Sequence, residues 1–291
     1  MSATTGAAAP RPPWLRVRLR LTQAFERVQR AVHDHDLNTV CYAAACPNLG
    51  ECWARGTATF MIGGGRCTRR CGFCDVATAR PAPLDPQEPE SVAEAVEALE
   101  LKFAVITAVA RDDLPDGAAA HMAATVRAIR RRRPGTGIEV LIPDYKGCED
   151  SLRTVLEARP DVLNHNVETV RRLQRKVRPA ARYDRSLSLL RRAGEIAPSV
   201  RTKSGIMLGL GETVEEIAVT LADLREAGVL LLTIGQYLRP SPDHLPVERY
   251  VTPAEFDAWA DRARAIGFRD VASGPLVRSS YRAEKLAGRL A

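Results

Sequence analysis

Apolar runs of strand length alternate with helical stretches along most of the chain. The apolar runs are Thr59–Ile62, Phe103–Val109, Ile138–Ile142, Val162–Asn166, Thr202–Leu208, Leu230–Gly235 and Arg269–Ala272. The helical stretches between them are Ser91–Leu101, Ala118–Arg132, Asp150–Ala158, Tyr183–Ala197, Val214–Ala227 and Pro253–Ile266. Strands that alternate with helices of about 10 to 15 residues indicate βαβ units and a parallel sheet. This number of units predicts an α/β fold, a partial or complete (β/α) barrel with its active site at the carboxyl ends of the strands.

The two ends of the chain fall outside this alternation. Residues 1–57 predict an irregular N-terminal extension that contains three cysteines, and residues 58–274 predict the barrel. Residues 275–291 predict a short C-terminal tail that contains the motif RSSY, residues 278–281. The segment Arg239–Val247 carries three prolines and predicts a long loop.

Composition places the chain among ordinary globular proteins. Of its 291 residues, 45% are hydrophobic, which suffices for a sizeable core and excludes disordered and collagen-like chains. No apolar run of about 18 residues is present, so we expect no membrane association. The first residues lack the apolar region of a secretory signal, so we expect a cytoplasmic protein.

The formal net charge of +7 is concentrated in one stretch of the chain. Residues 171–192 contain nine basic side chains and one acid, Asp184. A stretch of this kind binds nucleic acid or an acidic protein, or it forms a solvated helix face. The charge pattern alone leaves these three interpretations open.

The cysteines are clustered, with six of the seven between Cys41 and Cys74 and the seventh at Cys148. Clustered thiols without a secretory signal indicate metal or iron–sulfur ligation rather than disulfides. The set Cys67-x3-Cys71-x2-Cys74 directly follows the first predicted strand. Three thiolates at this spacing bind three irons of a [4Fe–4S] cluster and leave the fourth iron open, as a catalytic centre requires. A zinc site is the alternative, although zinc sites usually use two separated pairs of ligands.

A second set of three cysteines precedes the first predicted strand. Its spacing is Cys41-x4-Cys46-x5-Cys52, again without an evident fourth ligand. Six thiolates are too many ligands for one metal ion, so the two sets predict two separate clusters.

The sequence motifs resemble those of a known enzyme family. The first cysteine set, with Phe73 before its last cysteine, resembles the cluster motif of the radical SAM superfamily. The wider sequence resembles the lipoyl synthase family in the segments CYAAACPNLGECW, TATFMIGGGRCTRRCGFCDVATARP, RDDLPDGAAAH, EVLIPDYKG, NHNVETVRRL, KSGIMLGLGET, LTIGQYLRPSPDHLPVERYVTP and GPLVRSSYRA. These segments are collinear from about residue 11 to residue 283.

This resemblance implies a reaction and its cofactors. Members of the family insert two sulfur atoms at C6 and C8 of an octanoyl group bound to a lysine of a lipoyl carrier domain, and they cleave two S-adenosylmethionine molecules per product. The resemblance gives the radical-generating [4Fe–4S] cluster to Cys67, Cys71 and Cys74. It gives an auxiliary [4Fe–4S] cluster, consumed as the sulfur donor, to Cys41, Cys46 and Cys52. The RSSY motif adds Ser280 as the fourth auxiliary ligand, with Ser279 as the alternative.

Residues at predicted strand ends are candidates for contact with S-adenosylmethionine. They are Asn166, Glu168, Lys203, Ser204, Gly209 and Glu212. Turn formation and helix capping are the alternative roles for each of them. We expect His165 and His244 to be structural, and Cys148 to be a small residue outside the ligand sets.

The resemblance also implies partners. They are octanoylated lipoyl carrier domains, namely dehydrogenase E2 subunits and the glycine cleavage H protein, together with an electron donor such as ferredoxin or flavodoxin, and no nucleic acid. Such carriers are typically acidic, so we expect Arg171, Arg172 and Arg175 to contribute to docking. Two rival functions are a tRNA methylthiotransferase of the same superfamily and, in a different class, a zinc-stapled nucleic-acid-binding protein.

Overall fold

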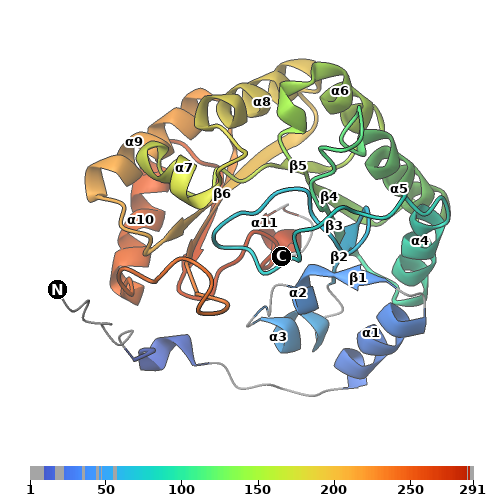
Figure 1. The fold of residues 1–291 in the computed structure, drawn as a ribbon, viewed down its shortest axis with the longest axis horizontal. Coiled ribbons are helices and arrows are strands. Elements are labelled where there is room, and N and C mark those ends of the chain that lie inside the picture. The colour runs from blue at the N-terminus through green and yellow to red at the C-terminus, as the bar shows by residue number, and fades with distance from the viewer. Residues whose placement is uncertain are drawn as a thin grey trace.

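The computed structural model describes residues 10–16, 23–34, 37–43, 46, 48–54, 58–286 and 288. Its strands form one sheet whose spatial order follows the sequence from β1 to β8 (Figure 1). They are β1 (Asn38–Thr39), β2 (Thr59–Ile62), β3 (Phe103–Ala108), β4 (Gly137–Leu141), β5 (Val162–Asn164), β6 (Arg201–Leu208), β7 (Leu231–Gln236) and β8 (Asp270–Gly274). Strands β2 to β8 pair in parallel, and β1 pairs antiparallel with β2.

Helices cover the outer face of this curved sheet (Figure 1). The α-helices are α1 (Gln23–Asp34), α2 (Val40–Ala43), α3 (Leu49–Ala54), α4 (Glu88–Ala98), α5 (Ala119–Arg132), α6 (Glu149–Glu157), α7 (Gln174–Val177), α8 (Tyr183–Ile196), α9 (Val214–Glu226), α10 (Pro253–Ala265) and α11 (Ala283–Leu286). Short 3-10 turns occur at Pro13–Leu15, Tyr145–Gly147 and Arg171–Leu173. Within the described residues no pairing joins β1 to β8, so the fold is a partial (β/α) barrel.

The predicted strands and helices are all present, with ends shifted by no more than three residues. The largest shift is at α4, which begins at Glu88 because Pro89 is accepted in the first turn of a helix. The same helix ends before Glu100, whose left-handed φ of 50° stops it. Capping boxes fix the starts of α9 and α10, at Thr213 and Thr252.

The N-terminal extension is more regular than the sequence predicted. Helix α1 has an apolar face formed by Phe25, Val28 and Val32. These side chains are buried in the same core as side chains of β2 and β3. The ring of Phe25 lies 5.0 Å from that of Trp53 on α3, centroid to centroid. The prediction of an irregular extension is therefore wrong for Gln23–Asp34.

The last helix of the C-terminal tail packs near the amino-terminal end of the barrel. Helix α11 packs against β3 and β8 and lies near the axis of the arc in Figure 1. Ala283 on this helix shares a small core with Val105, Val162 and Leu231, which lie near the starts of their strands. The opposite, carboxyl end of the barrel is left for the site.

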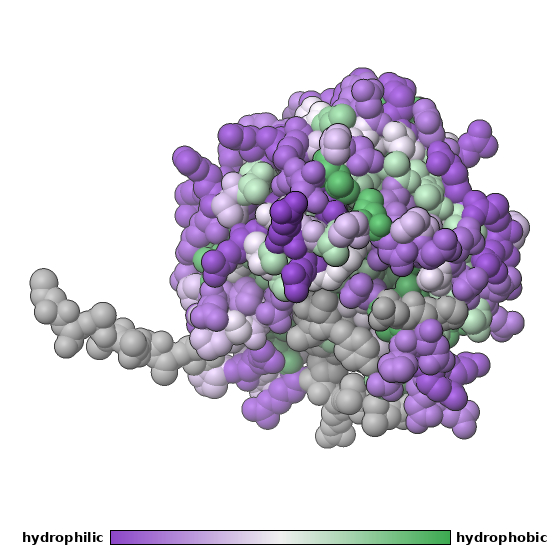
Figure 2. Space-filling view, turned by 45° about the vertical axis from the view of Figure 1, so that its right-hand side comes forward, coloured by the Kyte–Doolittle hydropathy of each residue, from purple (hydrophilic) through white to green (hydrophobic). Residues whose placement is uncertain are grey.

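The surface in Figure 2 is largely hydrophilic, with scattered hydrophobic residues. The large hydrophobic side chains exposed among the described residues are Trp14, Val214, Val219 and Ile266. No helix formed by these residues has the length and apolar character needed to span a bilayer.

Candidate active site

One cavity of about 510 Å³ lies at the carboxyl ends of the strands. Its walls include Ala108, Leu141 and Gln236, at which β3, β4 and β7 end, and Met207, which is one residue before the end of β6. Both predicted cysteine sets and both candidate serines line this same cavity: Cys41, Cys46, Cys52, Cys67, Cys71, Cys74, Ser279 and Ser280. The fold thus brings the N-terminal extension, the segment after β2 and the C-terminal tail to one space.

The segment Cys67–Cys74 is held from two sides by main-chain hydrogen bonds. Gly72 N donates to Val177 O at 2.9 Å, and Leu245 N donates to Gly72 O at 3.0 Å. A Cβ on Gly72 would lie only 2.9 Å from the Leu245 side chain, so this close approach requires glycine. Helix α7 and the loop after β7 therefore clamp the segment.

His244 fixes the end of this segment. Its Nε2 lies 3.1 Å from Cys74 O, and its Nδ1 lies 2.9 Å from Ser241 Oγ. A carbonyl oxygen only accepts, so Nε2 donates and Nδ1 accepts from the hydroxyl. His244 thus has a structural role, and the sequence had shown no partner for it.

The auxiliary set lies on two short helices. Cys41 is on α2 and is buried, Cys52 is on α3, and Cys46 lies between them. Cys46 N donates to Cys41 O at 3.1 Å, and Cys52 N donates to Asn48 O at 2.9 Å. These turns draw the three cysteines together at the cavity wall.

The C-terminal tail is tied directly to α3. Asn48 Nδ2 donates to Leu276 O at 2.6 Å. Tyr281 Oη lies 3.2 Å from both carboxylate oxygens of Glu51, and Arg282 Nη2 lies 3.1 Å from Glu51 Oε1. These contacts flank the RSSY motif and hold its serines beside the auxiliary cysteines.

Burial makes thiols of both sets resist ionisation in the absence of a metal. It raises the pKa of Cys71 to about 12 and that of Cys74 to about 11, and neighbouring cysteines in each set add to the rise. Burial likewise raises the pKa of Cys41, Cys46 and Cys52. Thiolates gathered in this way need a cationic centre, which a metal cluster supplies, so each set fits such a group. No three His, Cys, Asp or Glu side chains of the described residues converge on a single-ion site.

Each cysteine set has an arginine beside it, the buried Arg178 for one and the half-buried Arg278 for the other. The charge of Arg178 opposes the pKa rise of Cys71, and that of Arg278 opposes the rise of Cys46. Both arginines line the cavity, and burial lowers the pKa of each guanidinium. Arg178 was not predicted, because in the sequence it is indistinguishable from the other cations of residues 171–192.

Asn166 and Glu168 line the cavity, as a cofactor contact requires. Asn166 Nδ2 donates to Glu168 Oε1 at 3.0 Å, and Asn166 Oδ1 is buried without a hydrogen-bond partner. Glu168 adopts a left-handed φ of 64°, which is strained for this residue. A Cβ on Gly205 would lie 2.9 Å from Asn166 Oδ1, so glycine leaves this oxygen room.

The other four predicted contact residues lie outside the cavity lining. Lys203 Nζ is buried against both oxygens of Glu139, at 2.9 and 2.8 Å. Ser204 Oγ accepts from the main chain at 3.3 Å. Glu212 accepts from Gly209 N at 2.6 Å and closes the turn after β6. Lys203, Ser204, Gly209 and Glu212 thus have partners within the fold, and their contact with S-adenosylmethionine stays a prediction.

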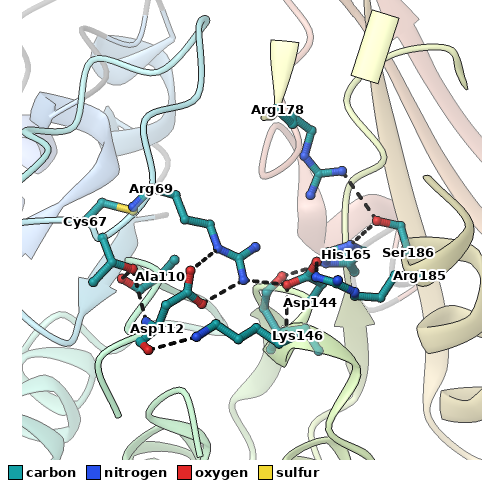
Figure 3. Close-up of polar contacts among 12 residues, drawn as sticks. Cys67, Arg69, Ala110, Asp112, Asp144, Lys146, His165, Arg178, Arg185 and Ser186 are labelled. Atoms are coloured by element: carbon teal, nitrogen blue, oxygen red, sulfur yellow. Dashed lines mark hydrogen bonds and ion pairs between the residues drawn. The ribbon is translucent and has the colours of Figure 1, made fainter. Parts of the chain in front are cut away.

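Arg69, inside the Cys67–Cys74 segment, lies between two carboxylates (Figure 3). Its Nε and Nη2 donate to Asp112 at 2.7 and 2.8 Å, and Nη2 lies 2.7 Å from Asp144 Oδ1. Asp144 Oδ2 in turn accepts from Arg185 Nη1 at 3.1 Å. The Arg69 and Asp144 side chains are 6% and 0% exposed, so each charge needs the other. The loops after β3 and β4 thereby anchor the segment.

His165 and Cys148 lie outside both cysteine sets. The His165 ring is bonded to Ile142 O at 2.9 Å and to Ser186 Oγ at 2.8 Å, and burial lowers its pKa to about 4. His165 is therefore a neutral residue at physiological pH. Cys148 is exposed at the start of α6, where a hydrogen bond with Ser151 lowers its pKa.

The basic stretch 171–192 is largely neutralised. Arg171 Nη1 lies 2.6 Å from Asp184 Oδ1, and Arg172 Nε lies 2.6 Å from Glu216 Oε1. Further ion pairs join Lys176 to Glu248, Arg185 to Asp144, and Arg192 to Glu149. Two of the three arginines that we expected to dock a carrier are thus already paired with carboxylates.

Comparisons with known proteins agree with this geometry. The radical SAM superfamily matches residues 61–224. Among solved structures, methylornithine synthase has a TM-score of 0.56 at 12% identity, covering 87% of this chain and 78% of its own. A maturase of the [FeFe]-hydrogenase has a TM-score of 0.55 at 14% identity, covering 90% of this chain and 70% of its own. These structures share the fold.

Curated relatives are much closer in sequence. The lipoyl synthase of Methylococcus capsulatus is 56% identical over 97% of this chain and 88% of its own length. That of Rubrobacter xylanophilus is 55% identical over 94% of this chain and 86% of its own length. The chain belongs to the lipoyl synthases, a family within the radical SAM superfamily.

Proposed function

We propose that this chain inserts two sulfur atoms at C6 and C8 of an octanoyl group bound to a lysine of a carrier protein. The observation that carries the proposal is the single cavity shared by both cysteine sets. Activation of a carbon atom and transfer of sulfur to it must occur within bonding reach of each other. One common cavity meets that requirement, and identity above 50% to curated lipoyl synthases supports the same reaction.

We assign the radical-generating cluster to Cys67, Cys71 and Cys74. When bound, it supplies the electron that cleaves S-adenosylmethionine to a 5′-deoxyadenosyl radical, which removes a hydrogen atom from the octanoyl chain. Asn166 and Glu168 hold the S-adenosylmethionine, because the unpaired amide oxygen and the carboxylate both accept hydrogen bonds from its hydroxyl and ammonium groups.

We assign the auxiliary cluster, which supplies the sulfur, to Cys41, Cys46 and Cys52. Ser280 provides the fourth ligand, and Ser279, which lines the same cavity, is the alternative. A hard serine oxygen suits an iron–sulfur centre less well than a thiolate does. Ser280 would therefore be the ligand most readily released from such a cluster.

The remaining cavity walls suit an acyl chain. They include the apolar side chains Met61, Val109, Leu141, Ile142, Ile206 and Met207. An octanoyl group gains roughly 0.8 kcal/mol for each methylene that these walls remove from water. The apolar lining also keeps water from a reactive carbon centre.

We propose octanoylated carrier domains as the substrates, namely dehydrogenase E2 subunits and the glycine cleavage H protein. Ferredoxin or flavodoxin supplies the electrons, and the reaction takes place in the cytoplasm.

An anaerobic assay tests the proposal. The reconstituted chain is incubated with an octanoylated carrier peptide, S-adenosylmethionine and a strong reductant, and the peptide mass is read. We expect two sulfur atoms to be added by a brown protein that holds about eight irons per chain. A colourless zinc protein, or methylthiolation of tRNA in place of the peptide, would overturn it.

A further inference from the structure

Two arginines at the rim of the cavity have no carboxylate partner among the described residues. Arg11 and Arg239 both line the cavity, with Arg11 exposed and Arg239 half-buried. Arg239 Nε donates to His244 O at 2.9 Å, and its Nη2 contacts Pro242 O. The loop therefore fixes this guanidinium in place without neutralising its charge.

Arg278 links the C-terminal tail to the end of β7. Its Nη1 donates to Val277 O at 2.8 Å and to Gln236 O at 3.3 Å, at the end of β7 and just before Arg239. Burial lowers the pKa of Arg278, and the nearby charge of Arg11 lowers it further. Positive charge therefore gathers where the tail meets the end of β7.

The lining as a whole has an excess of cations. Its arginines are Arg11, Arg69, Arg178, Arg239 and Arg278, and its carboxylates are Asp75 and Glu168. Of the arginines, Arg69 already faces Asp112 and Asp144, and Arg178 is buried. The basic stretch 171–192, by contrast, is mostly paired with acids of its own surface. Arg11 and Arg239 thus place positive charge at the cavity that no carboxylate of the described residues neutralises.

We propose that Arg11 and Arg239 form the docking surface for an acidic stretch of the carrier protein beside its acyl-lysine. This inference rests on the proposed function. The acyl-lysine enters through the rim, so the carrier surface around that lysine lies against these two arginines. Unpaired cations at the edge of an interface accelerate association with an acidic partner and fix its orientation.

The experiment compares Arg11→Glu with Arg16→Glu in the full reconstituted chain. Arg16 is an exposed arginine of the same segment that does not line the cavity, so it is a matched control. The substrate is an octanoylated acidic carrier domain. We expect Arg11→Glu to raise the carrier KM about tenfold at low ionic strength while kcat is retained. Arg16→Glu and Arg11→Lys should keep the wild-type KM.

Ionic strength and a second variant test the same docking surface further. At high ionic strength the KM of Arg11→Glu should approach that of the wild type, because screening removes the attraction in both. Arg239→Glu should change KM in the same direction. Equal KM values for Arg11→Glu and Arg16→Glu at low salt would overturn the docking surface. A wild-type chain that adds no sulfur would overturn the proposed function instead.

Discussion

Ser279 and Ser280 are adjacent in the chain and line the same cavity, yet only one of them completes the auxiliary ligand set in our proposal. The contacts of Glu51 with Tyr281 and Arg282 hold the motif in place from its C-terminal side. Removal of one serine hydroxyl should therefore affect sulfur insertion and leave the fold intact.

We predict that Ser280→Ala loses at least about tenfold of the lipoyl product while S-adenosylmethionine is still cleaved, because only the auxiliary site is altered. The measurement is the ratio of product to 5′-deoxyadenosine in an anaerobic assay. Ser279→Ala is the matched control and should retain product. If Ser280→Ala keeps full product yield, Ser280 is not the ligand.

His165 should make the stability of the fold depend on pH. Its pKa is about 4 in the folded chain because burial disfavours the charged ring, against 6.5 ordinarily. Unfolding therefore takes up a proton as the pH falls below 6.5, and stability that is complete above this value is lost toward pH 4. The loss at about pH 5 is roughly 2 kcal/mol.

Urea unfolding at about pH 7.5 and about pH 5 checks this prediction. His165→Gln should show a smaller difference between the two values than the wild type does. An identical pH dependence in both proteins would mean that the His165 ring is not the responsible group.

The sequence singled out both cysteine sets that line the cavity, but only two of its six candidate cofactor contacts, Asn166 and Glu168, line it as well. Cysteine spacing reveals a candidate ligand set directly, because three thiols within eight residues lie on one short segment of the chain. Lys203 and Ser204 sit on a strand next to the site, but strand position does not reveal which neighbour a side chain meets. The Lys203 ammonium donates a hydrogen bond to Glu139, which is 64 residues away in the sequence.

At the level of elements, ion pairs between loops hold the Cys67–Cys74 segment. Arg69 links this segment to the loops after β3 and β4 through Asp112 and Asp144, and Arg185 extends the network to α8 (Figure 3). Because these charges are buried, breaking one ion pair leaves a charge without its partner and lowers the free energy of unfolding.

We predict that Asp144→Asn destabilises the fold by about 3 kcal/mol, because it leaves the buried Arg69 with one carboxylate. It should also reduce the iron retained by the radical-generating site. Chemical unfolding and iron content measure the two effects. Glu149→Gln breaks exposed ion pairs and is the control, for which we expect little change in either. Wild-type stability and iron content in Asp144→Asn would refute the anchoring role.

Element prediction succeeded for the barrel and failed for the extension. In the barrel, each predicted strand supports the assignment of the helix next to it. Helix α1 lacks this support, because it has no neighbouring strand of ordinary length. Strand β1 has two residues, too few for any alternation to show. The apolar spacing of Phe25, Val28 and Val32 was the available signal for α1.

At the level of the whole molecule, the site depends on contacts between the two ends of the chain. Asn48 and Leu276 are 228 residues apart, and Glu51 and Arg282 are 231 apart. No local pattern predicts such contacts, because they follow from how the partial barrel brings distant segments of the chain together. The family resemblance, through the RSSY motif, was the only sequence signal that paired the tail with the extension.

We predict that Glu51→Ala frees the tail and weakens the auxiliary site while the radical-generating site is kept. Iron per chain should then fall from about eight toward about four. Glu26→Ala, an exposed acid on α1, is the control and should retain all the iron. Full iron occupancy in Glu51→Ala would show that the tail contact is dispensable.

The central claim is that the auxiliary set in the shared cavity supplies both sulfur atoms. The most direct measurement reconstitutes the chain with isotopically heavy sulfide, supplies octanoylated carrier peptide, S-adenosylmethionine and reductant without free sulfide, and reads the product by mass spectrometry. Our account predicts a lipoyl product with two heavy sulfur atoms, at no more than about one product per chain. A product with light sulfur, or S-adenosylmethionine cleavage without any sulfur addition, would contradict it.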